Sequence, residues 1–313
     1  MVTENKYTYN HFAKPADVWK YLALCEVMRN EQPKVYVETN SACADYHLNH
    51  TPEQEYGIYN FIEKAKIYEG LSESVYYQLE SSVIQENKYL GSPALAMRVL
   101  GDTVDKFHFF DIETAALSNV IAFANRNQSA DKVEVIKQDS IIGVLDLLPK
   151  LPKSTLVHID PYNIDKPSTN GKDYLDVFTE ASERGMKCVL WYGFNTLEEK
   201  KHLGDFMMDK LSGKTIDNLS CIELIMDIIQ KNTILCNPGI LGNGLLTSNL
   251  SNTSASTIEK YSKSLIDLYQ NTYYNGFKGS IYRDILDIKS AKPTNKKSIS
   301  NNLRRPKRGF KMR

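Results

Sequence analysis

The stretch Leu156-Val157-His158-Ile159-Asp160-Pro161-Tyr162-Asn163 decides the fold prediction. Its first four residues form a continuous, mainly apolar run, which is typical of a parallel strand that is buried on both faces. The polar residues after it then lie at the carboxyl end of a strand, where open α/β sheets bind their ligands. Asp-Pro-aromatic at this place is suited to receive an amino group of a nucleobase. The alternative is a strand that simply ends in a turn, because Asp-Pro dipeptides commonly start turns.

Strands and helices alternate on both sides of this stretch, which favours a doubly wound parallel α/β sheet. The other predicted strands are residues 35–37, 106–110, 133–136, 188–192 and 220–227. Helices are predicted at residues 113–126, 140–148, 174–184, 197–211 and 257–274. Residues 233–236 and 245–248, with turn residues at 237–239 and 242–244, are expected to form a closing hairpin.

The segment between the first two strands is predicted to be a helical insertion at about residues 48–88, with no strand of its own. A further helix then begins within Tyr89-Leu90-Gly91-Ser92-Pro93, and Ser92 before Pro93 is a typical N-cap pair. An N-terminal helix is expected after Pro15. Its apolar stripe leaves Lys20 to one side, so the helix pattern alone predicts a solvated or snorkelling lysine.

Composition and charge limit the class of protein. No apolar run approaches the roughly 18 residues that a membrane-spanning helix needs, and the N-terminus lacks the apolar core of a secretory signal. The five cysteines are scattered and form no Cys-x-x-Cys pair, so neither a metal site nor a disulfide framework is expected and a reducing cytoplasm fits best. They are Cys25, Cys43, Cys188, Cys221 and Cys236.

The net charge of zero hides an asymmetry. Of the 38 Lys and Arg residues, ten lie after Ile288, where there is no Asp or Glu, so the preceding part has 28 basic against 38 acidic residues and a net charge of −10. We therefore expect a folded acidic part, residues 1–287, and a basic tail, residues 288–313, that is disordered when free. The tail suits a polyanionic partner such as a nucleic acid, and the alternative is a tail that only aids solubility.

Acidic residues end two successive predicted strands. In a sheet that holds a nucleoside-bearing cofactor, a carboxylate at the end of the second strand accepts the ribose hydroxyls, and Asp111 occupies that place. Asp139 follows the third strand and is placed to meet an adenine amino group. Each is also explained as an acid at a helix N-terminus. The loop after the first strand, residues 38–44, has small residues but no glycine, so it is a poor match to a Gly-rich phosphate loop.

Several motifs in this order together resemble the large-subunit (23S) ribosomal RNA adenine-N6 methyltransferase family, whose members depend on S-adenosylmethionine. The resemblance covers roughly residues 7–250. It is carried by His11 with Ala16-Asp17-Val18-Trp19-Lys20, Tyr36-Val37-Glu38-Thr39-Asn40, Tyr89-Leu90-Gly91-Ser92-Pro93, the strand ends at Asp111 and Asp139, Ile159-Asp160-Pro161-Tyr162 and Leu190-Trp191-Tyr192. It implies the Rossmann-like sheet of class I methyltransferases.

The resemblance also implies site residues. Catalytic roles fall to Asp160, Pro161, Tyr162 and Asn163, and the cofactor site is formed by Lys20, Asn40, Ser92, Asp111, Asp139 and Asp160. Three departures are visible. The family's Asp-Thr-His-Ala-Gly-Ala-Gly loop is Glu38-Thr39-Asn40-Ser41-Ala42-Cys43-Ala44 here, its histidine after the lysine is Tyr21, and its Asp-Pro-Pro-Tyr lacks one proline.

The expected activity is methyl transfer to the N6 of adenine, with RNA, and ribosomal RNA in particular, as the favoured substrate. Asp160 and the Pro161 carbonyl accept the two N–H bonds of the amino group, no metal is required, and Tyr162 stacks on the base. Because one proline is absent, Asn163 is the alternative occupant of the aromatic's place. The alternative functions are a DNA adenine methyltransferase of a defence or mobile-element system and an inactive nucleic-acid-binding relative. Oligomeric state is not predicted.

Overall fold

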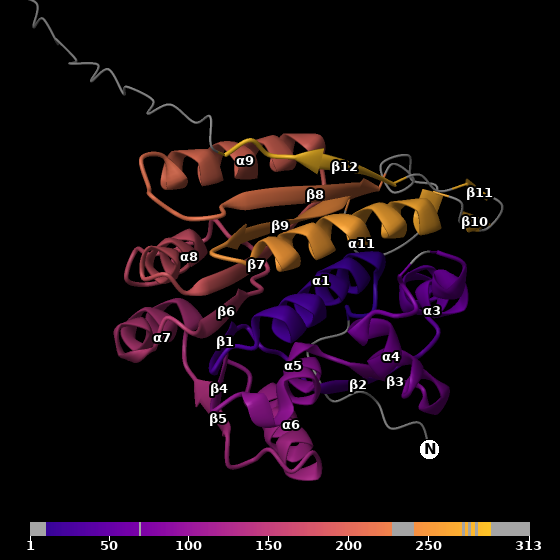
Figure 1. Ribbon diagram of the computed structural model, residues 1–313, viewed down its shortest axis with the longest axis horizontal. Helices are drawn as coiled ribbons and strands as arrows, with labels where there is room; N and C mark the ends of the chain where they lie inside the picture. The colour runs from indigo at the N-terminus through magenta and orange to yellow at the C-terminus, as the bar shows by residue number, and fades with distance from the viewer. Residues whose placement is uncertain are drawn as a thin grey trace, which may run out of the picture.

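An eight-stranded mixed sheet forms the centre of the protein, with strand order β12-β8-β9-β7-β6-β1-β4-β5 (Figure 1). The structure, a computed structural model, describes residues 11–68, 70–226, 241–270, 273–274, 277–278 and 281–288. The strands are β1 (Val35–Thr39), β4 (Lys106–Asp111), β5 (Val133–Lys137), β6 (Thr155–Ile159), β7 (Lys187–Phe194), β8 (Ser220–Met226), β9 (Gly242–Ser248) and β12 (Ile281–Ile285).

Six of these strands run in one direction, and β9 and β12 run against them. From β1 the chain adds β4 and β5 on one side, and it then returns to add β6 and β7 on the other. Strand order therefore reverses between β1 and β6, which is where doubly wound sheets bind ligands. The antiparallel β9 lies between β7 and β8. The predicted α/β fold with a Rossmann-like, doubly wound sheet is confirmed.

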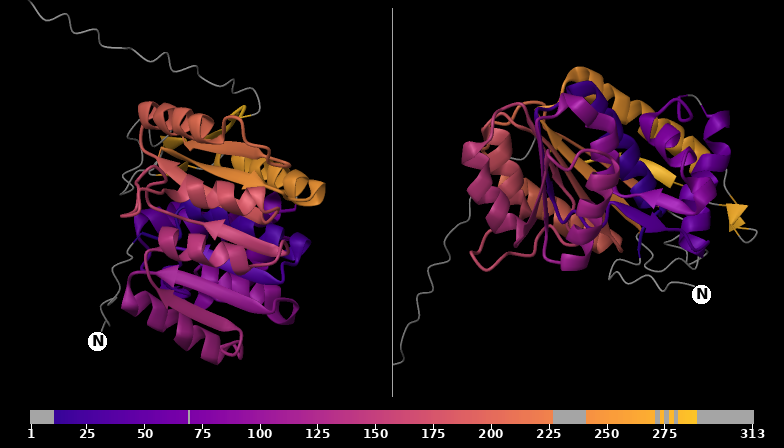
Figure 2. Two further views of the ribbon diagram at one scale, coloured as in Figure 1. Left: turned by 90° about the vertical axis from the view of Figure 1, so that its left-hand side faces the viewer. Right: turned by 90° about the horizontal axis from the view of Figure 1, so that it is seen from below.

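Helices cover both faces of the sheet, as the view along its edge shows (Figure 2, right). Side chains of a strand alternate between the faces, so two separate apolar cores form. One core contains Tyr36 and Leu156 and packs under the first group of helices, and the other contains Val37 and Val157 and packs under the second. The first group is α1 (Pro15–Glu31), α5 (Ser92–Leu100), α6 (Thr114–Arg126) and α11 (Asn252–Gln270), and the second is α7 (Ser140–Leu147), α8 (Tyr174–Glu183) and α9 (Leu197–Leu211).

The segment expected to be a helical insertion is bounded by a two-stranded antiparallel ribbon, in which β2 (Asp45–His47) pairs with β3 (Lys88–Leu90). Between them lie α2 (Pro52–Gln54), the π-helical turn η1 (Glu55–Tyr59), α3 (Asn60–Lys64), α4 (Val75–Ser81) and the 3-10 turns η2 (Ala65–Ile67) and η3 (Ile84–Glu86). The ribbon was not predicted, because three-residue strands are too short to give a clear alternating pattern.

Two helices, α5 and α11, differ from the sequence prediction at their ends. Gly91, not Ser92, is the N-cap of α5, and the Ser92 hydroxyl bonds elsewhere. Helix α11 begins at Asn252 and ends at Gln270, and residues 273–274 instead form β10 (Tyr273–Tyr274), which pairs with β11 (Phe277–Lys278). The short 3-10 turns η4 (Gly101–Thr103) and η5 (Leu148–Lys150) follow α5 and α7.

Some predicted features lie outside the described residues. These are the strand at 233–236, the turn at 237–239 and the basic tail from residue 289 onward. Strand β9 pairs with β7 and β8. Among the helices of the described ranges, none combines the length and the apolar character that crossing a membrane requires.

Candidate functional site

A pocket of about 360 Å³ opens at the carboxyl ends of β1, β4 and β5. It brings together side chains that are far apart in the sequence because parallel strands end at one edge of a sheet. Its lining includes five of the predicted site residues, namely Asn40, Asp111, Asp139, Tyr162 and Asn163. Its volume falls within the range of about 300–1,000 Å³ that is usual for small-molecule sites.

The loop after β1 turns without glycine. Asn40 (φ 52°) and Ala42 (φ 51°) both adopt the left-handed region, which asparagine tolerates and which costs alanine about 1–2 kcal/mol. The Ala42 N–H donates to Asp111 Oδ2 (2.9 Å), and this bond stabilises the turn. Burial, with smaller contributions from Asp111 and Asp45, raises the pKa of the Cys43 thiol to about 12, so this cysteine stays protonated at neutral pH.

Asp111 and Asp139 each have a structural role at the rim of this pocket. Asp111 accepts hydrogen bonds from the backbone of Ala42 and Glu113 (both 2.9 Å) and so joins the loop after β1 to the start of α6. Asp139 is the N-cap of α7: its Oδ1 accepts from Ile141 N (2.9 Å), and its Oδ2 accepts from the Ser168 hydroxyl (2.7 Å). The alternative explanation of Asp139 as a helix N-terminal acid is therefore correct, and both carboxylates also line the pocket.

The predicted catalytic Asp160 lies beside this pocket and forms an ion pair with Lys20. Lys20 Nζ is 2.7 Å from Asp160 Oδ2 and 3.2 Å from Asp17 Oδ1, and only 5% of the lysine is exposed. The expectation of a solvated or snorkelling lysine was wrong, because Lys20 binds the carboxylate of Asp160, which is 140 residues away in the sequence. The Asp160 N–H donates to Thr39 Oγ1 (3.1 Å), which fixes the strand end to β1.

Two aromatic rings complete the environment of this lysine, since Nζ lies 4.5 Å from the ring centre of Tyr21 and 4.9 Å from that of Trp191. Burial by itself lowers the pKa of Lys20, but the nearby Asp160 and the Tyr21 and Asp17 groups outweigh it, and the pKa lies well above its ordinary value. Lys20 therefore remains a cation throughout the neutral range. Together with Asp17 and Asp160 it forms a trio with one positive and two potential negative charges.

Ser92 does not line the 360 Å³ pocket. It belongs to a buried polar cluster under the first helical group, in which its hydroxyl donates to Glu38 Oε1. The Tyr36 hydroxyl donates to Glu38 Oε2 (3.0 Å), and His158 Nδ1 lies 3.3 Å from Glu38 Oε1. Glu38 and His158 lie opposite each other in the β1–β6 register. The sequence analysis did not predict that Glu38 and His158 belong to this cluster. The signal was present, because Glu38 is two residues from Tyr36 and His158 is two residues from Asp160, and residues two apart in a strand lie on the same face of the sheet.

The residues after Asp160 point in different ways. Pro161 is buried, whereas Tyr162 is 87% exposed at the mouth of the pocket, with Asn163 beside it in the lining. With this exposure the Tyr162 ring packs little against the rest of the protein and faces the solvent. The arrangement gives two adjoining parts: a nucleoside-sized pocket and, next to it, a carboxylate held by a lysine.

No family model matches the sequence, and no curated protein matches it either. Among solved structures, the chain is similar to protein LPL1258 from Legionella pneumophila, which is assigned to the family model DUF519. The TM-score is 0.66 at 22% identity, with 88% of this chain and 99% of that chain covered. At this identity the similarity concerns the fold.

Weaker similarities are found to proteins described as methyltransferases. One is an rRNA methylase from Streptococcus thermophilus, with a TM-score of 0.37, 10% identity, and 77% of this chain and 100% of that chain covered. Another is a SAM-dependent methyltransferase from Agrobacterium tumefaciens, with a TM-score of 0.38, 11% identity, and 74% of this chain and 60% of that chain covered. Both scores are too low to carry an argument about function.

Proposed function

We propose that this protein is an S-adenosylmethionine-dependent methyltransferase that acts on the N6 amino group of adenine in a nucleic acid, with RNA as the favoured substrate. The single observation that carries the proposal is the position of Asp160-Pro161-Tyr162. This motif ends β6 at the place where strand order reverses, next to a pocket lined by Asp111 and Asp139.

The pocket fits the nucleoside part of the cofactor. In this proposal Asp111 accepts hydrogen bonds from the ribose hydroxyls, and Asp139, whose Oδ2 also accepts from the Ser168 hydroxyl, accepts one from the adenine amino group. Ile112 and Ile141 supply apolar surface for a flat ring. When bound, S-adenosylmethionine supplies a methyl group on a positively charged sulfur.

The Lys20–Asp160 pair orients the carboxylate for the target amino group. Lys20 holds Oδ2, and within the described residues no hydrogen-bond partner contacts Oδ1. Oδ1 and the Pro161 carbonyl then accept the two N–H bonds of the amino group and favour a pyramidal nitrogen. Because the Lys20, Asp17 and Asp160 trio has a net charge of −1, it stabilises the positive charge that develops on this nitrogen, by about 3–4 kcal/mol per well-placed group in analogy with oxyanion donors.

Tyr162 supports recognition of a base outside a helix. Its exposed ring offers a stacking surface worth about 1–3 kcal/mol per base in single-strand binders, and a base in a duplex must first be flipped out. Asn163, the alternative occupant of this place, offers hydrogen bonds and no stacking surface.

The test is transfer of tritiated methyl groups from S-adenosylmethionine to total RNA and, separately, to total DNA. Wild type is expected to label RNA at adenine N6, and Asp160→Asn is expected to reduce the rate by about 10²–10³-fold, as loss of one electrostatic group does elsewhere. Labelling of DNA alone would assign the alternative substrate. Wild type that transfers no methyl group to either nucleic acid, although thermal shift shows cofactor binding, would refute the proposal.

A further inference from the structure

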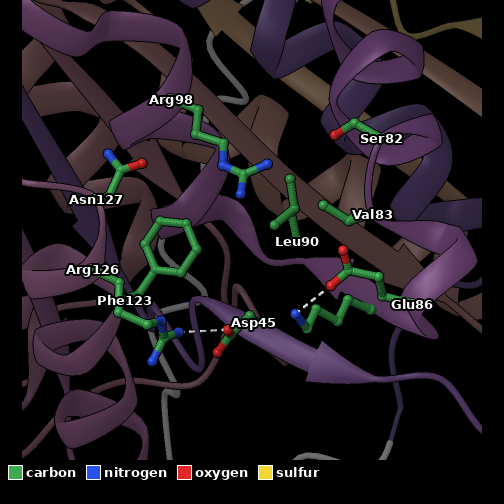
Figure 3. Close-up of a pocket in the computed structure, with 10 residues that line it drawn as sticks. Asp45, Ser82, Val83, Glu86, Leu90, Arg98, Phe123, Arg126 and Asn127 are labelled. Carbon is green, nitrogen blue, oxygen red and sulfur yellow. Dashed lines mark hydrogen bonds and ion pairs between the residues drawn. The ribbon is translucent and has the colours of Figure 1, made fainter.

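A second pocket, of about 320 Å³, lies outside the candidate site, between the β2–β3 ribbon, α5, α6 and the turn after α4 (Figure 3). Three basic side chains line it, namely Lys88, Arg98 and Arg126, and two acidic ones, Asp45 and Glu86. The lining is therefore net positive, in a part of the chain, residues 1–287, whose net charge is −10.

Arg98 is the least satisfied of these cations. Lys88 Nζ pairs with Glu86 Oε2 (2.5 Å) and Arg126 Nη2 pairs with Asp45 Oδ2 (2.6 Å), whereas no carboxylate of the described residues comes within 4.0 Å of the Arg98 guanidinium. Figure 3 shows its guanidinium directed into the space between Phe123 and Leu90. A planar guanidinium presents five N–H donors in a fork that matches a phosphate or carboxylate.

Phe123 fixes the geometry of the two arginines. The ring is buried, and the guanidinium carbons of Arg98 and Arg126 each lie 5.6 Å from its centre. This contact orients both groups without using their N–H donors. Arg98 and Arg126 also stand in the last turns of α5 and α6, where a cation offsets the helix dipole. If Arg98 and Arg126 only offset the helix dipoles, they would need neither their common contact with Phe123 nor a place in the lining of the pocket.

The pocket is joined to the candidate cofactor site by a short, well-anchored piece of chain. The N–H of Ala42 binds Asp111 at that site, and three residues later Asp45 pairs with Arg126. Three residues of extended chain span at most about 11 Å. Asn119 of α6 accepts hydrogen bonds from Ala44 N (2.8 Å) and Asp45 N (3.3 Å), so this connection is held in place.

We propose that this pocket, which we call the Arg98–Arg126 pocket, binds a backbone phosphate of the nucleic-acid substrate. This inference rests on the proposed function, because it takes its ligand from the substrate of that site. Arg98 is the main ligand. Arg126 is the second, and it turns from Asp45 to the phosphate as the nucleic acid arrives.

The test measures binding of the full chain to a labelled single-stranded RNA of about 20 nucleotides, longer than usual single-strand sites, by fluorescence anisotropy over a series of salt concentrations. Arg98→Gln should weaken binding about fivefold at 0.1 M salt and reduce the slope of log K against log salt by about 0.7, the value for one phosphate contact on a single strand. Arg98→Lys should keep the slope and lose part of the affinity, because it keeps the charge without the fork.

A gain of affinity provides a sharper criterion. Asp45→Asn removes the carboxylate that competes for Arg126 and retains an oxygen for Asn119, so it should strengthen RNA binding and leave the salt slope equal to or steeper than that of wild type. Arg184→Gln is the matched control. Arg184 pairs with Glu180 on α8, on the opposite face of the sheet, and its loss should leave binding unchanged.

Each outcome separates this inference from the proposed function. If Arg98→Gln binds RNA with wild-type affinity and slope while wild type methylates RNA, the inference fails and the proposed function stands. Arg98-dependent binding of inorganic phosphate or AMP, without an effect of Arg98→Gln on RNA binding, also overturns it. Wild type that binds neither RNA nor DNA overturns both. Altered melting temperature with unaltered salt slope assigns Arg98 to the helix end alone.

Discussion

Replacing Lys20 by Met should destabilise the protein more than replacing Asp160 by Asn, although the two side chains form one ion pair. In Lys20→Met, Asp160 and Asp17 both lose their common cation and are left as two carboxylates in a nearly buried site. In Asp160→Asn, Lys20 keeps Asp17 at 3.2 Å and its contacts with Tyr21 and Trp191.

The geometry gives the magnitude. At 2.7 Å the Coulomb attraction is about 6 kcal/mol at an effective dielectric constant of about 20, and the cost of removing both ions from water reduces the net value. Loss of one partner of a buried pair costs about 3–5 kcal/mol. We expect about 4 kcal/mol for Lys20→Met, about 1–2 kcal/mol for Asp160→Asn, and a coupling of about 2 kcal/mol in the double variant.

Urea unfolding at pH 7, followed by circular dichroism for wild type, both single variants and the double variant, measures these values. The m-values should agree among the four proteins, so that the free energies are comparable. A coupling below about 0.5 kcal/mol, the usual limit for independent sites, would refute the ion pair as the interaction that holds Asp160. Equal losses in the two single variants would refute the part assigned to Asp17.

Three further predictions concern single side chains. Burial raises the pKa of Glu80 well above 4.5, so the folded state holds a proton that the unfolded state releases above that pH. The free energy of unfolding therefore falls as pH rises. Glu80→Gln should remove this pH dependence, which amounts to up to about 1.4 kcal/mol per pH unit in urea unfolding between pH 5.5 and 8. Gly91→Ala should lower the free energy of unfolding by about 3 kcal/mol, because its Cβ would lie 2.1 Å from the Cys43 carbonyl oxygen, and a melting temperature equal to that of wild type would contradict this. Asp139→Ala should lower the free energy of unfolding by about 1 kcal/mol because it removes the N-cap of α7, whereas Asp139→Asn should lower it little. Weaker cofactor binding by the Asn variant, measured by calorimetry, would therefore report the proposed ligand role alone.

The sheet could be predicted from the sequence because its central strands are continuous apolar runs that end at acidic or turn-forming residues. β6 and β1 are buried at every position, which is the pattern that a parallel strand leaves in a sequence. The pocket residues Asn40, Asp111 and Asp139 were also predictable, since each stands at the carboxyl end of a predicted strand. The β2–β3 ribbon was not, because three residues on each side carry no usable period.

The environments of Lys20 and Ser92 could not be derived from local sequence. Lys20 stands in a helix whose other residues are almost all buried, so the charged side chain has no exposed stripe to mark its orientation. Its partner Asp160 is 140 residues away. Ser92 precedes a proline, as a capping serine does, but the chain places its hydroxyl on Glu38, 54 residues away. Both outcomes depend on packing between distant segments, which no local propensity encodes.

The motif Asp160-Pro161-Tyr162 lacks the second proline of the family's Asp-Pro-Pro-Tyr, and this difference comes after Asp160, the residue of the motif that the fold holds most firmly. Asp160 is fixed by strand β6, by its N–H bond to Thr39 and by Lys20, and none of these contacts involves a residue after Pro161. The shortening therefore acts on the residues beyond Pro161, and it places Tyr162, 87% exposed, and Asn163 at the mouth of the pocket. Under the proposed function, the acceptor for the amino group is retained and the stacking surface is altered. The departure then bears on which nucleotide enters the site, while the carboxylate chemistry at Asp160 stays as the fold sets it.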